Sequence, residues 1–162
     1  MKARIPGRQR RLNPESRPEI RKRLERVAAL TLIEDFGFGA RGEKLRSIER
    51  EVREELAEYD AKYPDLQKEI QAVADDAKAM GIDGYVRPGS GGKVLLGWEH
   101  DLYYITDLKA LRRREKFGEE RMTRFQSGMC KRIRYYNNVF AEEPGTMADV
   151  MQNRLHTYGK MV

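Results

Sequence analysis

The chain has 162 residues, of which 40% are hydrophobic and 36% charged, and its formal net charge is +6. A chain of this length forms one domain, or two small subdomains that share a core. Its one cysteine excludes an internal disulfide, its two histidines and one cysteine exclude the usual tetrahedral zinc sites, and no apolar run approaches the roughly 18 residues of a membrane span.

The first elements in chain order are a basic arm and a helix. Residues 1–15 contain glycine and prolines but no periodic apolar pattern, so we expect an extended arm that a partner could order. Ser16, followed three residues later by Glu19, is a capping box that predicts a helix extending to about Asp35. Three glycines within residues 37–42 end that helix.

Two further helices complete a predicted N-terminal helical subdomain, residues 16–81. The second helix is expected over about Glu43–Tyr63, where apolar residues recur at near-heptad spacing. Pro64 and Asp65 end it and cap the third helix, which extends to Gly81. We expect the apolar stripe of the second helix to pack within the chain, so a homodimeric coiled coil is not favoured.

A β-hairpin is predicted in the insert that spans residues 82–106. Strands are expected at 85–87 and 93–98, separated by the Gly-rich turn at 88–92. Residues 102–105 fit a third strand, which the sequence leaves undecided. The hairpin, with its third strand, occupies residues 84–105. Arg87 and Lys93 would then lie on a wing that touches a nucleic-acid backbone.

A C-terminal basic helical subdomain is predicted for residues 107–162. Thr106 or Asp107 caps a fourth helix, a fifth spans about Glu119–Asn137, and Thr146 with Asp149 caps the last after a loop at 142–145. The fold class is therefore mainly α, with about six helices and a small β-hairpin insert.

An internal duplication of one helical unit is a further interpretation that we leave open. The segment from Leu32 to Gly37 precedes a helix, a proline corner and another helix. The segment from Leu111 to Gly118 does the same, so both halves fit a unit of helix, Phe-Gly corner, helix, proline corner and helix.

The corner Asp35-Phe36-Gly37-Phe38-Gly39 resembles the Phe-Gly-Phe-Gly signature of small uncharacterised phage and prophage proteins of Gram-positive bacteria. In those proteins a Lys/Arg-rich helix with Leu and Phe three residues apart follows the corner, and residues 117–125 match that spacing better than residues 39–48. The resemblance implies an origin in a mobile genetic element, and it supplies no catalytic residues. Because no apolar run is long enough for a membrane span and the Arg-rich N-terminus has no apolar h-region, we expect a cytoplasmic location in a bacterial host.

Positive charge is concentrated in two blocks. Residues 1–26 carry ten Lys/Arg against three acids and residues 105–134 carry ten against four, whereas residues 27–104 are acidic. Such blocks are typical of a protein that binds polyanions, and tyrosines at the end of the second block could stack on exposed bases. The predicted nucleic-acid or partner-binding residues are Arg8, Arg10, Arg11, Arg21, Lys22, Arg23, Arg87, Lys93, Lys109, Arg112, Arg113, Arg114, Arg121, Arg124, Lys131, Arg132, Arg134, Tyr135 and Tyr136.

The sequence supports a catalytic function less well than it supports nucleic-acid binding. The Gly-rich turn at residues 89–93 fails the spacing of a phosphate-binding loop, because Arg87 stands where glycine is needed and Val94 where a hydroxyl is needed. The run Glu99-His100-Asp101 is expected to be a solvated turn, and a metal-dependent nuclease that uses Asp83, Glu99 and Asp101 is a distant third hypothesis. We expect no catalytic residues, no metal and no cofactor.

The sequence thus predicts a non-enzymatic accessory protein of a phage or mobile element that binds nucleic acid through its arm and basic helices. The alternative is a protein–protein inhibitor of a host nucleoprotein defence complex, of the anti-CRISPR type. The expected partner is nucleic acid or a host protein–nucleic acid complex, and no membrane contact is expected.

Overall fold

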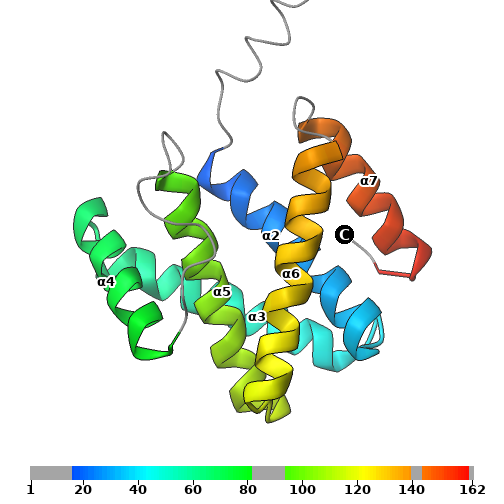
Figure 1. Ribbon diagram of the computed structural model, residues 1–162, viewed down its shortest axis with the longest axis horizontal. Helices are drawn as coiled ribbons and strands as arrows, with labels where there is room; N and C mark the ends of the chain where they lie inside the picture. Colours follow the sequence, from blue (N-terminus) through cyan, green and yellow to red (C-terminus); the bar gives the residue numbers. More distant parts are fainter. Residues whose placement is uncertain (1–15, 82–93, 140–143, 161–162) are drawn as a thin grey trace, which may run out of the picture.

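The computed structural model describes residues 16–81, 94–139 and 144–160, and these ranges contain six helices and no strand (Figure 1). The helices are α2 (Arg17–Phe36), α3 (Glu43–Lys62), α4 (Leu66–Ala79), α5 (Val94–Glu115), α6 (Glu119–Val139) and α7 (Pro144–Thr157). The mainly α prediction is confirmed. None of the described helices combines the length and the apolar character that crossing a membrane requires.

Local signals explain where the first helices begin and end. The Ser16 side chain accepts from the Glu19 N–H while Glu19 accepts from the Ser16 N–H at 2.9 Å, which confirms the capping box. Gly37 ends α2 in the left-handed conformation (φ 71°), and the Phe38 N–H bonds back to the Leu32 carbonyl at 3.0 Å. The Asp65 carboxylate caps α4 by accepting two backbone N–H groups.

The predicted strands at residues 94–98 and 102–105 are wrong, because both segments belong to α5. Thr106 and Asp107, expected to cap a helix, are buried in its middle instead. The helix α5 packs against α2, α3 and α4, so residues 102–105 are buried on every face and lack the polar stripe that marks a surface helix. The remainder of the predicted hairpin, residues 84–93, lies outside the described residues.

The start of the last helix also differs from the prediction. The helix α7 begins at Pro144, so Thr146 lies within its first turn rather than capping it. A proline is well suited to this position, since its fixed φ is helical and the first N–H groups of a helix have no partner within the helix.

The chain has two halves of three helices each, α2–α4 and α5–α7, and the first helix of each half packs against the last two helices of the other half. We call this arrangement the exchange of α2 and α5. The helix α2 packs against α6 and α7, whereas α5 packs against α3 and α4, and α2 and α5 also contact each other. Figure 1 shows α4 at one edge of the molecule and α7 at the opposite edge. Residues of both predicted subdomains therefore contribute to one hydrophobic core.

Buried positions of the two halves match with a spacing of 77 residues between α3 and α6 and of 78 residues between α4 and α7. The core residues of α3 match those of α6, and the buried residues of α4 match those of α7 in the same way. The matched pairs are Leu45 and Met122, Ile48 and Phe125, Val52 and Met129, Leu56 and Ile133, Tyr59 and Tyr136, Glu69 and Met147, Val73 and Met151, and Ala77 and Leu155.

The corners that follow α2 and α5 have similar backbone conformations, but the residues that correspond differ from those suggested by aligning Phe36-Gly37 with Phe117-Gly118. Lys116 is left-handed (φ 57°) like Gly37, and the Phe117 N–H bonds to the Leu111 carbonyl as Phe38 bonds to Leu32. Phe117 therefore corresponds to Phe38 rather than to Phe36.

Candidate nucleic-acid interface

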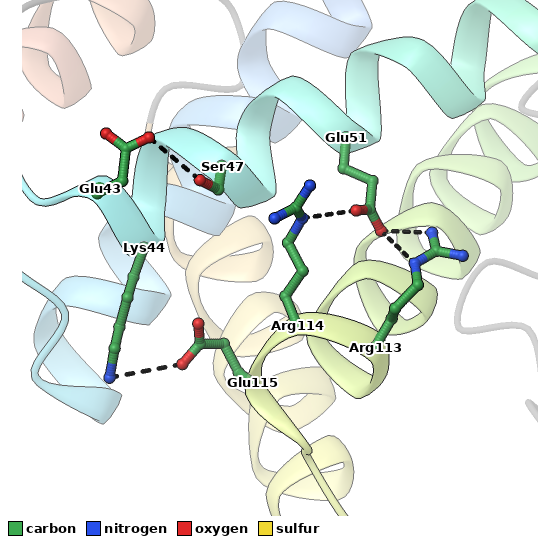
Figure 2. A pocket seen from close by; sticks show the side chains of 7 residues that line it. All are labelled: Glu43, Lys44, Ser47, Glu51, Arg113, Arg114 and Glu115. Carbon is green, nitrogen blue, oxygen red and sulfur yellow. Dashed lines mark hydrogen bonds and ion pairs between the residues drawn. The ribbon is translucent and has the colours of Figure 1, made fainter.

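Two of the three arginines at the end of α5 are held by carboxylates of α3. Arg114 donates to Glu51 at 2.6 Å, and Arg113 donates to the same carboxylate at 2.9 Å (Figure 2). Arg113 also donates to Glu55 at 3.2 Å. Partial burial of Glu51 favours its protonated form, but the two guanidinium groups outweigh this effect and lower its pKa. The predicted binding residues Arg113 and Arg114 thus join α5 to α3.

The depression around these arginines is electrically balanced (Figure 2). Its charged lining consists of three bases and three carboxylates, and the Lys44 ammonium lies 3.5 Å from Glu115. The Ser47 hydroxyl also donates to Glu43 at 3.4 Å. A lining without excess charge gives little attraction for a polyanion.

Arg132 is likewise committed to the fold. Its guanidinium donates to Glu34 at 2.8 Å and to Asp35 at 2.9 Å, and its side chain is only 13% exposed. Hydrogen bonds from Arg132 are the main reason why the pKa of Asp35 is lowered. Arg132 therefore bridges α6 to α2 and is not available to a phosphate.

Arg21 and Glu99 belong to a partly buried network that joins α2, α3 and α5. Arg21 donates to Glu99 at 3.0 Å and to Asp60 at 2.8 Å, and Arg17 donates to Glu99 at 2.5 Å. Glu99 is fully buried, as His100 and Asp101 nearly are, so the expectation of a solvated turn is wrong. No cluster of residues suited to hold a metal occurs within the described ranges, and Asp83 lies outside them.

Four further predicted cations lie against apolar or aromatic groups. Lys109 lies over Tyr59, Arg121 over Phe117 and Arg124 over Phe36, at 5.6, 5.2 and 4.7 Å from the ring centroids. Arg112 approaches the Met122 sulfur at 3.4 Å. Such contacts hold the stems of these side chains on the protein while parts of the charged heads stay in solvent.

One group of predicted residues remains on an exposed surface of α6, which we call the α6 face. Lys131 and Arg134 are exposed and form no ion pair with a described residue, and the neighbouring Tyr135 is 55% exposed. The α6 face is a shallow depression lined by Gln126, Ser127, Cys130, Lys131, Arg134 and Tyr135. None of these described lining residues is a carboxylate.

Tyr136, predicted together with Tyr135, points the other way. It is buried and accepts a hydrogen bond from Arg154 at 3.2 Å. Its ring meets the edge of Tyr135, with centroids 5.1 Å apart. Tyr136 therefore supports the exposed ring from below and is not itself a contact residue.

The other predicted cations are divided between surface, core and undescribed segments. Lys22 is exposed on α2, whereas Arg23 is buried. Arg8, Arg10, Arg11, Arg87 and Lys93 lie outside the described residues.

A second positive site, which the sequence reading missed, lies between α2, α3 and Lys160. We call it the basic cavity, and it is lined by Lys22, Glu25, Arg26, Ala40, Arg41, Arg46, Glu49, Arg53 and Lys160. Of these, only Lys22 was predicted as a site residue. Three of its arginines come from the segment that is acidic in total, and only the fold brings them beside α2.

Comparison with known proteins gives no relative from which a function could be transferred, because no family model, curated protein or solved structure matches the chain.

Proposed function

We propose that this protein binds nucleic acid with exposed bases through the α6 face, without catalysis. Lys131 and Arg134 would contact backbone phosphates while Tyr135 stacks on a base. The observation that carries the proposal is a tyrosine ring, 55% exposed, beside two cations in a depression without carboxylates. Base stacking on an aromatic side chain combined with cations along the backbone is how many proteins bind single strands.

Comparison of the two halves supports this assignment. We infer that the halves derive from duplication of one three-helix unit, as their matched buried positions suggest. At the positions of α3 that correspond to Lys131 and Tyr135, the chain has the exposed residues Glu54 and Glu58. At these matched positions the two helices therefore carry opposite charge, which favours α6 over the corresponding part of α3 as a face for single-stranded nucleic acid.

The test is fluorescence anisotropy with labelled single-stranded DNA, single-stranded RNA and duplex DNA over a range of salt. Single strands should bind best, and the double variant Lys131→Gln/Arg134→Gln should reduce the slope of log K against log salt by about 1.4, since each phosphate contact contributes about 0.7. Tyr135→Ala should weaken binding by about 1–3 kcal/mol, whereas Tyr135→Phe keeps the ring and should bind nearly as well as the parent.

The matched control is Lys68→Gln/Lys78→Gln, which removes the same charge from exposed positions of α4. Equal losses from both double variants would mean that net charge alone determines binding, and the α6 face would then have no special role. Absence of binding to every probe at low salt would overturn the proposal. The phage origin and the inhibition of a host complex stay predictions of the sequence.

A further inference from the structure

The basic cavity contains more positive charge than its own carboxylates compensate. Six of its nine lining residues are cations and two are carboxylates. Arg53 pairs with Glu25 at 2.6 Å and Lys160 pairs with Glu49 at 2.9 Å. Four cations remain for which no described carboxylate lies within ion-pair distance.

Two of these four are oriented by backbone carbonyls. The Arg41 Nε donates to the Gly159 carbonyl at 3.1 Å, and Arg46 donates from Nη2 to the Arg41 carbonyl at 2.7 Å. Carbonyl oxygens fix these guanidinium groups in place without neutralising them. The N–H groups of Arg41 and Arg46 that these two bonds do not use can therefore donate to an anion.

The other two cations, Lys22 and Arg26, lie one turn apart on α2. The Nε of Arg26 is buried, yet it has no hydrogen-bond partner among the described residues. Buried polar groups in folded proteins nearly always have a partner, and the Glu49 Oε2 in the same lining is also unpaired, so the cavity holds a donor and an acceptor that a bound ligand could satisfy.

The lining also defines the class of ligand. Among the described lining residues, Ala40 is the one without a charge, and none is an aromatic residue that could stack on a base or a ring. Guanidinium forks and ammonium groups match the oxygens of phosphate, which carries close to two negative charges as a monoester near neutral pH. A ligand bound here would be recognised through phosphate oxygens alone.

We propose that the basic cavity binds a phosphate group, which can come from a phosphorylated end of a nucleic acid or from a free diphosphate. The site shares no residue with the α6 face, so it does not depend on the proposed function. Lys22 and Arg26, which no described carboxylate neutralises, donate to the phosphate oxygens. Arg41 and Arg46 donate to the same phosphate from the other side chains of the lining.

The experiment is a titration with sodium pyrophosphate at constant ionic strength, followed by calorimetry and by the NMR signal of the Arg26 Nε–H. We expect saturable binding and a shift of that signal. Lys22→Gln/Arg26→Gln should lower the affinity about tenfold or more, because it removes two charged donors while every ion pair of the cavity remains. Arg46→Gln is a second variant on a different helix and should also weaken binding.

The matched control is Lys131→Gln/Arg134→Gln, which should bind pyrophosphate like the parent protein. Equal losses in the two double variants, or no binding of pyrophosphate, would overturn the proposal. Anisotropy with oligonucleotides that end in 5′-phosphate or 5′-hydroxyl distinguishes the sources. A preference for the phosphorylated end that Lys22→Gln/Arg26→Gln removes assigns the cavity to nucleic acid, and pyrophosphate binding without that preference assigns it to a free diphosphate.

Discussion

The rings of Phe36 and Phe117 pack against each other with their centroids 5.1 Å apart, although each belongs to the corner of a different half. Phe117 is almost fully buried, and Phe36 also contacts Phe125 of α6. The two corners thus meet at one aromatic cluster. This cluster lies where the exchanged helices α2 and α5 both end.

Phe117→Ala should lower the free energy of unfolding by about 3–5 kcal/mol, since it removes a buried ring and leaves a cavity. Urea denaturation measures the change. Leu66→Ala is the control, because Leu66 is 40% exposed and its loss should cost far less. Similar losses for both variants would show that the aromatic cluster does not stabilise the junction of the halves.

Gly128→Ala should destabilise the protein although alanine favours helices over glycine by about 1 kcal/mol. An added Cβ would lie 2.5 Å from the Asp35 carboxylate and 2.8 Å from the buried Thr31 side chain. The helices α2 and α6 would have to separate, at a net cost of about 1–3 kcal/mol in thermal or urea unfolding.

Gly118→Ala is the matched control, since its Cβ would meet nothing within 4 Å. Stabilisation by Gly128→Ala would contradict the close approach of α2 and α6.

Arg132→Ala should be much more damaging than Arg113→Ala. Both arginines bind two carboxylates, but the Arg132 side chain is 13% exposed and that of Arg113 is 58% exposed. Loss of Arg132 leaves Glu34 without one of its partners in a partly buried place and should cost about 2–4 kcal/mol. Loss of Arg113 should cost less than about 1 kcal/mol, because solvent screens exposed pairs.

Urea denaturation of the two variants provides the comparison, and high salt should reduce the effect of Arg113→Ala more strongly. Equal losses of unfolding free energy in the two variants would contradict the expectation that burial makes the Arg132 ion pairs contribute more to stability than those of Arg113.

The contribution of Glu69 to stability should fall as the pH rises through neutrality. Burial, followed by a hydrogen bond with Asp60, raises the pKa of Glu69 to about 7, although Arg17 acts in the opposite direction. The folded state therefore keeps a proton that the unfolded chain loses near its ordinary pKa. Stability from this proton is complete at low pH and is lost as the pH passes the folded pKa.

Unfolding free energies at about pH 5 and about pH 8 measure this loss, and Glu69→Gln should flatten the difference. Glu58→Gln on the exposed side of α3 is the control and should leave it unchanged. The lowered pKa values of Glu34, Asp35 and Glu51 act only in acid, where protonation of these carboxylates destabilises the fold. A pH profile that Glu69→Gln leaves intact would contradict the assignment.

The helices with one polar side were predictable from sequence, and the central helix was not. Spacing and caps define α3, α4 and α6 to within about two residues, because each keeps a solvated face. The helix α2 is buried on every side at residues 27–32, and its ends were predictable from the capping box at Ser16 and from Gly37. Residues 102–105 of α5 are surrounded by other helices, so their apolar run gives no helical period. Their enrichment in tyrosine and isoleucine then favours a strand.

The candidate sites were only partly predictable from sequence, because a count of charges along the chain does not show which charged residues the fold brings close together. The bases at 112–114 seemed to lack acidic neighbours, but Glu51 and Glu55 reach Arg113 from a helix far away in sequence. Conversely, Arg41, Arg46 and Arg53 were hidden in an acidic segment and become a positive lining beside Arg26. Lys131, Arg134 and Tyr135 kept their predicted exposure, since no neighbouring helix covers them in the described structure.

The exchange of α2 and α5 also constrains how the protein is made. During synthesis α2 leaves the ribosome long before α6 and α7, which supply most of the surface that covers its apolar side. The nascent chain therefore lacks part of the cover of α2, whose buried apolar residues include Ile20, Leu24 and Val27, until the last helix has been translated. We expect folding to be late and cooperative, with binding of chaperones to this first helix, rather than stepwise formation of one half and then the other.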